Sequence, residues 1–328
     1  MKSKSKKWVL TVIIICLLLI SISIGVICLK YFETKKYKNT DNIESSQIEN
    51  NIVEYHGKKY EYNDNLINIL FLGIDNDTEI QSQNTPGLGG QADCIMILSM
   101  DEETKTSKIL QISRDTMADI DIYDAQGMHY TTIWAQLATQ YAYGNRASTS
   151  CWAMKKKVGE LLDNIPIYGY ISLDIKGVSI MNDYVGGVTV TIPENYTEID
   201  KAFIKGKTIT LNGEQAEKYV RYRNIDVRGS NSLRMKRQVQ YIPALQNKMR
   251  KVLGESEQKV SEFDSLMSEY LVTDLTVEDI KGMTGYAWET ENVTYLPGKI
   301  VEGKETEEFH LDDEGLKKTI IDMFYKAK

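Results

Sequence analysis

One stretch near the start of the chain constrains its fold more than any other, residues 8–29. It reads WVLTVIIICLLLISISIGVICL and contains no charged residue and no proline. As an α-helix, 22 residues span the roughly 30 Å hydrocarbon layer of a membrane. A cleaved signal peptide has a shorter apolar core and a small-residue cleavage site, which the following Lys30-Tyr31-Phe32 does not provide. The stretch therefore predicts an uncleaved transmembrane helix rather than a signal peptide or a buried core helix.

The flanks of this stretch predict how the chain is divided. Lysines are equally frequent before and after it, so their count does not decide the orientation. We expect the usual arrangement for a short N-terminal tail, with residues 1–7 in the cytoplasm and the rest outside the cell. Residues 30–62 are rich in Asn, Glu, Lys and Ser without apolar periodicity, which is typical of a stalk. Residues 63–328 are then an extracellular domain on a single-pass protein of the cell membrane.

Charge and cysteine content restrict the function of the outer part. Residues 1–38 hold eight lysines and one glutamate, whereas the whole chain has a net charge of −7, so the remainder is strongly acidic. An acidic domain argues against nucleic acid as a partner. Cys94 and Cys151 are the two cysteines outside the apolar stretch. We expect them to be small buried side chains, with a disulfide as the alternative.

Strand-like and helix-like patterns alternate along the outer part. Near-continuous apolar runs at 66–74, 94–100 and 108–113 predict buried strands, the last two joined by a turn. Further strands are expected at 165–173, 186–193, 208–211 and 292–296. Helices are expected at 131–143, 148–162, 174–184, 212–223, 232–253 and 312–327, the fourth with a capping box at Asn212 and Gln215. The predicted fold class is α/β, a mixed central β-sheet flanked by helices and preceded by the transmembrane helix.

Arginine is concentrated in one short segment. Five of eight arginines fall between 221 and 237 in a chain that has 31 lysines. They are Arg221, Arg223, Arg228, Arg234 and Arg237. Because the planar guanidinium suits bidentate contacts to oxyanions, this usage favours an anion site. Arg234 and Gln238 share a helix face at i and i+4, near a helix start that also favours anions. A solvated basic face is the alternative.

A second polar cluster follows the first strands. Asp75 leaves the first strand, Asp93 enters the second, and Arg114 and Asp115 leave the third. If the second strand is antiparallel to the other two, all four residues lie at one sheet edge, where ligands gather in such folds. Two carboxylates beside an arginine-rich site indicate Mg²⁺ bridging the protein and a pyrophosphate. The alternative is that the aspartates are turn and cap residues.

Seven segments occur in an order that carries a family resemblance. They are NILFLGID (68–75), ADCIMILSMD (92–101), ISRDT (112–116), QYAYG (140–144), VGGVTVTIPE (185–194), LNGEQAEKYVRYRN (211–224) and LRMKRQVQYI (233–242). Over about residues 66–250 the chain resembles the LytR-CpsA-Psr family of cell-wall glycopolymer ligases. The resemblance implies transfer of a glycan-phosphate, teichoic-acid-like or capsular, from a polyprenyl-pyrophosphate carrier to a peptidoglycan hydroxyl, with Mg²⁺ as cofactor. It also implies contact with membrane lipid.

The resemblance also implies roles for individual residues. Asp75 and Asp93 would hold Mg²⁺. Arg114 would contact the pyrophosphate, with Asp115 beside it as a base or supporting residue. The pyrophosphate would further be bound by Arg221, Arg223, Arg234, Arg237, Gln238 and Gln91. Phosphoryl transfer depends on positioning and charge neutralisation, which such a set of residues provides.

The chain departs from the family pattern at Gln91-Ala92-Asp93, where the family usually has Arg-Ser-Asp, and residues 78–90 are an insertion. Gln91 is expected to offer a neutral hydrogen bond in place of the missing guanidinium. The predicted helices at 148–162 and 174–184 are candidates to line a lipid groove. Two other functions stay open: a pyrophosphatase acting on the same carrier, and a non-catalytic membrane-anchored envelope sensor that binds the lipid-linked ligand.

Overall fold

The computed structural model describes residues 52–76, 86–224, 226–288, 293–303 and 306–328, which fall into two compact units. The described part of the first unit consists of residues 52–62 and 327–328. In it, β1 (Ile52–Tyr55) and β2 (Lys58–Tyr62) form an antiparallel hairpin. The predicted transmembrane helix at 8–29 lies outside the described residues, and none of the helices within them is long and apolar enough to cross a membrane.

The second unit, residues 63–326, is built on a six-stranded sheet in the order β11-β8-β3-β4-β5-β12. Its strands are β3 (Leu66–Ile74), β4 (Ala92–Asp101), β5 (Ser107–Ile112), β8 (Gly169–Asp174), β11 (Leu271–Thr273) and β12 (Val293–Tyr295). Strand β4 is antiparallel to both β3 and β5, whereas β8 is parallel to β3 and β12 to β5. The predicted mixed sheet is confirmed. The central strands are buried almost throughout because both faces of the sheet are covered.

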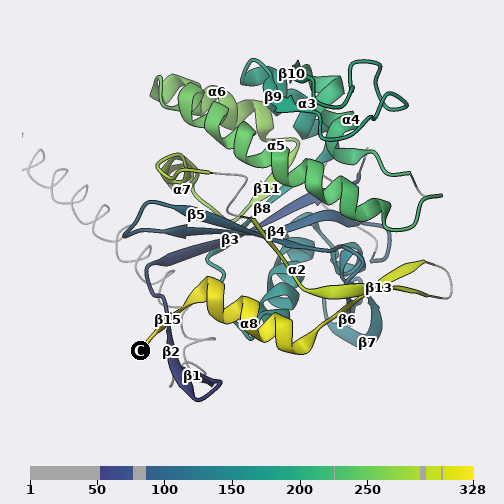
Figure 1. Ribbon diagram of the computed structural model, residues 1–328, viewed down its shortest axis with the longest axis vertical. Coiled ribbons are helices and arrows are strands. Elements are labelled where there is room, and N and C mark those ends of the chain that lie inside the picture. The colour runs from purple at the N-terminus through teal and green to yellow at the C-terminus, as the bar shows by residue number, and fades with distance from the viewer. Residues whose placement is uncertain (1–51, 77–85, 225, 289–292, 304–305) are drawn as a thin grey trace, which may run out of the picture. The chain divides into compact units, whose positions relative to one another are not determined.

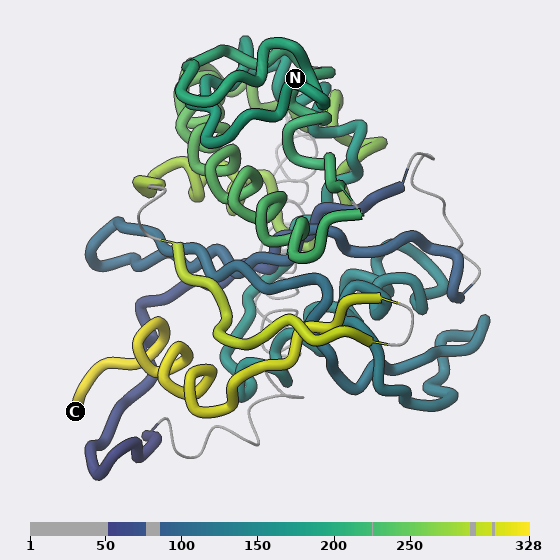
Figure 2. Tube along the Cα trace, turned by 45° about the vertical axis from the view of Figure 1, so that its right-hand side comes forward, coloured from purple at the N-terminus to yellow at the C-terminus, as the bar shows by residue number. Residues whose placement is uncertain are grey.

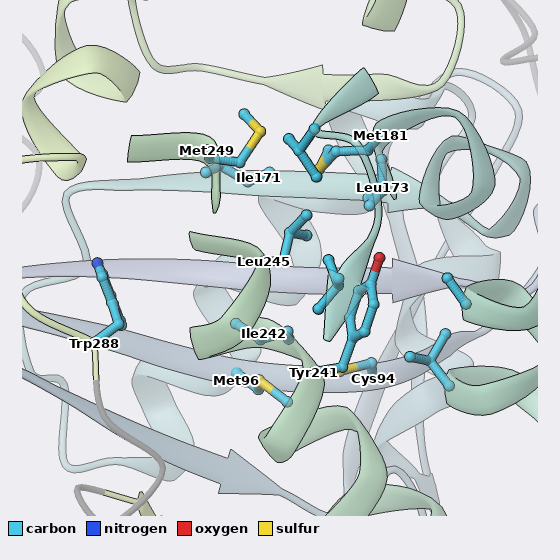
Figure 3. Close-up of a cluster of buried hydrophobic side chains, with 14 of the residues drawn as sticks. Cys94, Met96, Ile171, Leu173, Met181, Tyr241, Ile242, Leu245, Met249 and Trp288 are labelled. Atoms are coloured by element: carbon cyan, nitrogen blue, oxygen red, sulfur yellow. The ribbon is translucent and has the colours of Figure 1, made fainter. Parts of the chain in front are cut away.

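Four helices and a small hairpin cover one face of this sheet (Figure 1). They are α3 (Ile175–Tyr184), β9 (Val188–Thr191), β10 (Thr208–Leu211), α4 (Gly213–Arg221), α5 (Ser230–Leu253) and α6 (Glu257–Met267), with α7 (Val277–Met283) at the side of β5. Figure 3 shows α5 directing Ile242, Leu245 and Met249 onto the sheet residues Met96 and Ile171. Each such side chain contributes roughly 1.5–3 kcal/mol by leaving water. This packing fixes α5 over the sheet.

The other face is covered by the remaining elements of the second unit (Figures 1 and 2). They are β6 (Met117–Tyr123), β7 (His129–Gln136), the 3-10 helix η1 (Leu137–Tyr143), α2 (Ala147–Leu161), β13 (Gly298–Glu302), β14 (Glu307–Leu311) and α8 (Asp313–Phe324). Strand β15 (Tyr325–Ala327) follows α8. The predicted helix at 131–143 is wrong for its first half, because residues 129–136 pair with β6 as an antiparallel strand. The β-branched and aromatic residues of HYTTIWAQ suit a strand.

Two local predictions about this unit are confirmed. Asn212 caps α4 through a capping box, in which its side chain accepts from the Gln215 N–H at 2.8 Å and the Gln215 side chain accepts from the Asn212 N–H at 3.3 Å. Cys94 and Cys151 are buried free thiols, so the alternative of a disulfide is excluded. Burial raises the pKa of each thiol to about 12, which keeps both protonated and unreactive at neutral pH.

Candidate active site

The predicted polar cluster lies at one edge of the sheet. Strands β3 and β5 run in the same direction because each is antiparallel to β4, so their carboxyl ends meet the start of β4. Asp75 follows β3, Asp93 lies near the start of β4, and Arg114 and Asp115 follow β5. The shared edge expected from the sequence is confirmed.

A β-bulge aims Asp93 at this edge. Gly73 pairs with Cys94 and Ile74 pairs with Ala92, so Asp93 is the extra residue of β4. Bulges bend a strand and redirect a side chain. Strands β3 and β4 lie so close together at this point that position 73 requires glycine, since a Cβ at Gly73 would lie 2.9 Å from the Cβ of Cys94. The bulge thus turns one carboxylate toward the arginines.

Two guanidinium groups from segments far apart in the chain bind the Asp93 carboxylate. Arg114 donates to one oxygen, and Arg234 Nη1 donates to the other at 2.7 Å. Arg234 lies in the first turns of α5, and its side chain is 4 % exposed. Burial lowers the pKa of Arg234, and the charge of Asp93 opposes that shift. The guanidinium of Arg234 remains cationic at neutral pH in spite of this shift.

One of these two arginines also has an unused donor. The Nε–H of Arg234 is buried and has no hydrogen-bond partner within the described parts of the chain, whereas Arg114 Nε lies 3.4 Å from a carboxylate oxygen of Asp115. A buried donor without a partner costs about 1–3 kcal/mol. That cost would be recovered if an oxyanion bound Arg234, so this donor suits a phosphate group.

The neighbouring residues Gln91 and Arg221 complete the cluster. The Gln91 side-chain oxygen accepts a hydrogen bond from Arg114, so Gln91 orients that guanidinium. Its direct contact with a pyrophosphate stays a prediction. Arg221 at the end of α4 pairs with Asp75 at 2.9 Å, and both side chains are 39 % exposed. This second ion pair therefore lies at the solvent-facing side of the site.

An apolar cavity opens beside these charges, between the sheet and the helices of the first face. Asp75, Asp93, Arg221, Arg234 and Gln238 line its polar part. Its apolar wall comes from β3, β4, β8, α3, α4 and α5: Phe71, Gly73, Ile74, Cys94, Leu173, Ile175, Val178, Val220, Tyr241, Ile242 and Leu245. Figure 3 shows Tyr241, Ile242 and Leu245 of α5 facing Cys94 and Leu173 of the sheet. The site therefore joins a cluster of guanidinium and carboxylate groups to an apolar chamber.

The helices that line this cavity are only in part those that were predicted to line a lipid groove. The predicted helix at 174–184 contributes as α3, but the predicted helix at 148–162 does not. That segment is α2, which packs on the opposite face of the sheet (Figure 1). Helix α5 takes its place in the wall. The physical reason is topological, since the crossover before β8 carries α2 to the other face.

Arg237 is not brought into the cluster. Its Nε donates to the Tyr219 carbonyl at 2.7 Å, its Nη2 donates to the Tyr222 carbonyl, and its guanidinium lies 4.6 Å from the Tyr196 ring centroid. The last carbonyls of a helix lack partners within the helix, and here Arg237 supplies donors to the end of α4. The predicted phosphate contact of Arg237 is therefore not seen; the residue binds backbone inside the protein.

Arg223 is near the cluster but occupied elsewhere. Its Nε donates to Ser230 Oγ at 3.2 Å, and its Nη2 lies 3.4 Å from a Glu307 carboxylate oxygen. Glu307 also accepts from the Gly229 N–H at 2.9 Å. Arg223 thus ties the loop before α5 to β14. Gln238, by contrast, lines the cavity while its Nε2 donates to the Val220 carbonyl at 3.1 Å.

Asp115 lies behind Arg114, not in the cavity. It accepts hydrogen bonds from Asn231 Nδ2 at 2.7 Å and from Gln136 Nε2 at 3.4 Å. Burial raises its pKa, and the charges of Arg114 and Arg223 oppose that shift. Asn231 in turn accepts from Arg234 at 2.8 Å, so it links Asp115 to the cluster. Sequence reasoning missed Asn231, Gln136 and Glu307, which belong to no recognisable motif.

The residues present are compatible with a shared metal ion. Asp75 and Asp93 both line the cavity beside the arginines. Mg²⁺ is usually bound through one or two carboxylates together with substrate phosphates. Within the described ranges no three carboxylate, imidazole or thiol side chains group as a metal site of their own. The donor set therefore fits an ion that arrives with a phosphorylated substrate.

Comparisons with known proteins agree with this architecture. TagV of Bacillus subtilis, a polyisoprenyl-teichoic acid–peptidoglycan teichoic acid transferase, is 29% identical over 213 residues, 62% of this chain and 47% of the relative. TagU of Oceanobacillus iheyensis, of the same description, is 29% identical over 231 residues, 70% of this chain and 66% of the relative. The chain thus spans from about half to two thirds of these two relatives.

Solved structures share the fold. The Lin1025 protein of Listeria innocua is 25% identical with a TM-score of 0.55, covering 78% of this chain and 96% of that one. The structure of TagT bound to LI-WTA is 23% identical with a TM-score of 0.60, covering 79% and 90%. The model of the LytR_cpsA_psr family matches residues 28–305. The chain belongs to the LytR_cpsA_psr (LytR-CpsA-Psr) family.

Proposed function

We propose that the protein transfers a glycan-phosphate from a polyprenyl-pyrophosphate carrier to a peptidoglycan hydroxyl. The observation that carries the proposal is an apolar cavity whose polar end is lined by Asp75, Asp93, Arg221 and Arg234, with Arg114 bound to Asp93. A lipid diphosphate has the same two halves, an apolar chain and a charged head. The names of the curated relatives, teichoic acid transferases, support the same reaction.

The chemistry requires charge neutralisation more than a covalent nucleophile. The acceptor oxygen forms a bond to the phosphorus that carries the sugar, and the bond from that phosphorus to the bridging oxygen breaks. Polyprenyl phosphate leaves, and the hydroxyl loses its proton. Arg114, Arg221 and Arg234 would bind the phosphate oxygens and stabilise the charge that builds up on the leaving group. Mg²⁺ held by Asp75 and Asp93 would supply further neutralisation of the diphosphate.

The proposal includes a place in the cell. We propose that residues 8–29 anchor the protein in the cell membrane with residues 63–328 outside, where a lipid carrier and the wall are both within reach. Protease added to intact protoplasts should then digest the C-terminal domain and leave a fragment in the membrane. Full protection of the domain until lysis would contradict this orientation.

The transfer itself is tested with the full-length protein in detergent, a polyprenyl-pyrophosphate sugar, Mg²⁺ and a peptidoglycan acceptor. A glycan–acceptor product supports the proposal. Release of polyprenyl phosphate without that product would instead identify a pyrophosphatase. Binding of the lipid-linked sugar without turnover would identify a non-catalytic sensor. That class stays open because Gln91 stands where the family usually has an arginine.

Two substitutions locate the reaction. Arg114→Ala and Arg221→Ala should each lower turnover at least about a hundredfold, because each removes a cation from the developing charge. Arg250→Ala is the matched control, since Arg250 is exposed near the end of α5, away from the cavity. Turnover in either site variant equal to that of the control would refute the assignment.

A further inference from the structure

A second cavity lies on the opposite face of the sheet from the first. It measures about 420 Å³ and is bounded by the hairpin β6–β7, helices α2 and α8, and strand β14. Figures 1 and 2 show these elements grouped on the face that α5 does not cover. The mechanism above does not use this cavity.

The walls of the second cavity combine an exposed aromatic plane with charged groups. Trp134 on β7 is 60 % exposed and stands in register opposite Asp119 on β6. Lys157 is buried in the wall, where its ammonium pairs with Glu160 at 2.7 Å and with Asp121 at 3.4 Å. The apolar part is formed by Met117, Leu161, Leu311 and Leu316.

The cavity begins close to the active site along two strands. Met117 lines it two residues after Asp115, and the register partner of Met117 is Gln136, whose amide donates to Asp115. On the other side, His310 lines it directly after Phe309, whose N–H donates to the Asp115 carbonyl at 2.8 Å. A long ligand in this cavity would therefore point its end toward the Asp115–Arg114 edge.

These walls match a saccharide. A pyranose ring has an apolar C–H face that packs on an aromatic plane, and hydroxyls around its rim that bond to carboxylates and an ammonium. Pockets of this kind use apolar walls with a few polar groups that set orientation. An exposed indole beside Asp119 and Glu160 provides both elements.

The charge of the cavity favours a neutral saccharide over an anionic one. Among the described residues, Asp119, Glu160 and Asp313 face it against the ammonium of Lys157, and His310 is the one further ionisable side chain of its wall. A phosphate-rich polymer would be repelled by this excess of carboxylates. A neutral glycan strand would not.

We propose that this cavity binds the neutral N-acetylhexosamine strand of the acceptor and presents its hydroxyl to the active-site edge. The proposal deepens the transfer reaction and rests on it for the identity of the acceptor. Trp134 supplies the stacking plane, and Asp119 and Glu160 accept hydrogen bonds from the sugar.

Saccharide binding is tested first without any donor. A neutral β-1,4-linked N-acetylglucosamine hexasaccharide is titrated calorimetrically into the full-length protein. Trp134→Ala should weaken binding at least about tenfold, because it removes the stacking plane. Trp152→Ala is the matched control: its side chain is 53 % exposed on α2 but does not line the cavity. It should bind the hexasaccharide like wild type.

The transfer assay gives a second readout. Trp134→Ala should raise the KM for the peptidoglycan acceptor about tenfold while binding of the polyprenyl-pyrophosphate donor, measured alone, stays unchanged. Absence of turnover in wild type would overturn the transfer reaction but leave the hexasaccharide titration to decide the cavity.

Two results would overturn the cavity assignment. One is hexasaccharide binding that is absent in wild type or equal in Trp134→Ala and Trp152→Ala. The other is Trp134-dependent binding of a poly(glycerol phosphate) probe, which would place the anionic donor polymer there.

Discussion

Asp93 is the residue on which the charge balance of the active site depends. Its carboxylate is the shared counter-ion of Arg114 and of the buried Arg234. Asp75 has a different environment, because it and Arg221 are both more than a third exposed. Asp75 and Asp93 share the predicted role of holding Mg²⁺, but the stability of the fold should depend more on Asp93.

Replacing each aspartate by asparagine tests whether the more buried Asp93 matters more for stability than the more exposed Asp75. Asp93→Asn leaves two guanidinium groups together without a counter-ion, which should lower the free energy of unfolding by about 3 kcal/mol. Asp75→Asn should lower it by less than about 1 kcal/mol, since exposed ion pairs contribute little. Urea denaturation of both variants measures the difference. Added pyrophosphate should raise the stability of Asp93→Asn more than that of Asp75→Asn, because it replaces the missing counter-ion of two arginines. Equal losses and equal gains in the two variants would contradict an oxyanion site.

Asp174 is a buried carboxyl that stands apart from the reaction. It ends β8 and precedes α3, yet its side chain does not cap the helix and its Oδ2 has no partner among the residues described. Burial raises its pKa to about 7. The folded protein therefore holds this proton more tightly than the unfolded chain does.

Because of this raised pKa, the contribution of Asp174 to the free energy of unfolding falls as the pH rises. Stability from Asp174 is fully present below about pH 4, the pKa of an unfolded aspartate, and is lost as the pH rises to about 7. Asp174→Asn should therefore be more stable than wild type at pH 8 by roughly 1–2 kcal/mol, with little difference at pH 4. Urea denaturation at the two pH values tests this. A gain of equal size at both would show that the carboxyl is not the cause.

At the scale of elements, hydrogen bonds from side chains of α5 hold the end of α4, which carries Arg221 of the candidate site. Donors on α5 reach the carbonyls at the end of α4: Arg237 binds those of Tyr219 and Tyr222, and Gln238 binds that of Val220. Arg221 is the last residue of α4. The position of Arg221 thus depends on Arg237, whose guanidinium binds backbone carbonyls at the end of α4.

Arg237→Lys tests this division of roles. A lysine keeps the charge but loses the planar fork that serves two carbonyls, so the free energy of unfolding should fall by about 2–3 kcal/mol. The KM for the donor should rise because Arg221 shifts. Arg221→Lys is the control and should reduce turnover while leaving thermal unfolding nearly unchanged. Loss of turnover without loss of stability in Arg237→Lys would instead make Arg237 a phosphate contact.

At the scale of the second unit, the sheet separates two cavities of different chemistry. The apolar chamber lies on the face covered by α3 and α5, and the carboxylate-lined cavity lies on the face covered by α2 and α8. The charged edge formed by Asp93 and Arg114 lies at the ends of the strands between them. Such an arrangement suits a reaction between a lipid-linked donor and a polar acceptor.

Ligand binding should stabilise this unit as a whole. At a hundredfold excess over Kd, a short prenyl pyrophosphate with Mg²⁺ should add about 2.7 kcal/mol to the free energy of unfolding. For a unit of this size the melting temperature should rise by about 2–4 °C per kcal/mol at most. Removing Mg²⁺ with EDTA should cancel most of the rise. The matching prenyl alcohol is the control, and an equal shift with the alcohol would mean that the charged cluster takes no part.

The local pattern of the sequence was sufficient to predict much of the fold. The apolar runs that became β3, β4 and β5, the capping box at Asn212 and the meeting of Asp75 with Asp93 at one edge all follow from residues near one another in the chain. The strand β7 was not predicted, although its β-branched and aromatic residues suit a strand, because the pairing with β6 that forms it does not show in the local pattern of residues 131–136.

By itself, the sequence determined the α/β class, the buried strands whose ends carry the charged residues and the group of arginines from which the site draws. Only the tertiary structure decided which arginine faces the cavity and which, as Arg237 does, binds backbone carbonyls inside. It also decided that α5 rather than α2 walls the apolar chamber. The reason is physical: periodicity and capping are local properties, whereas the direction of a guanidinium and the face that a helix covers depend on partners distant in the chain.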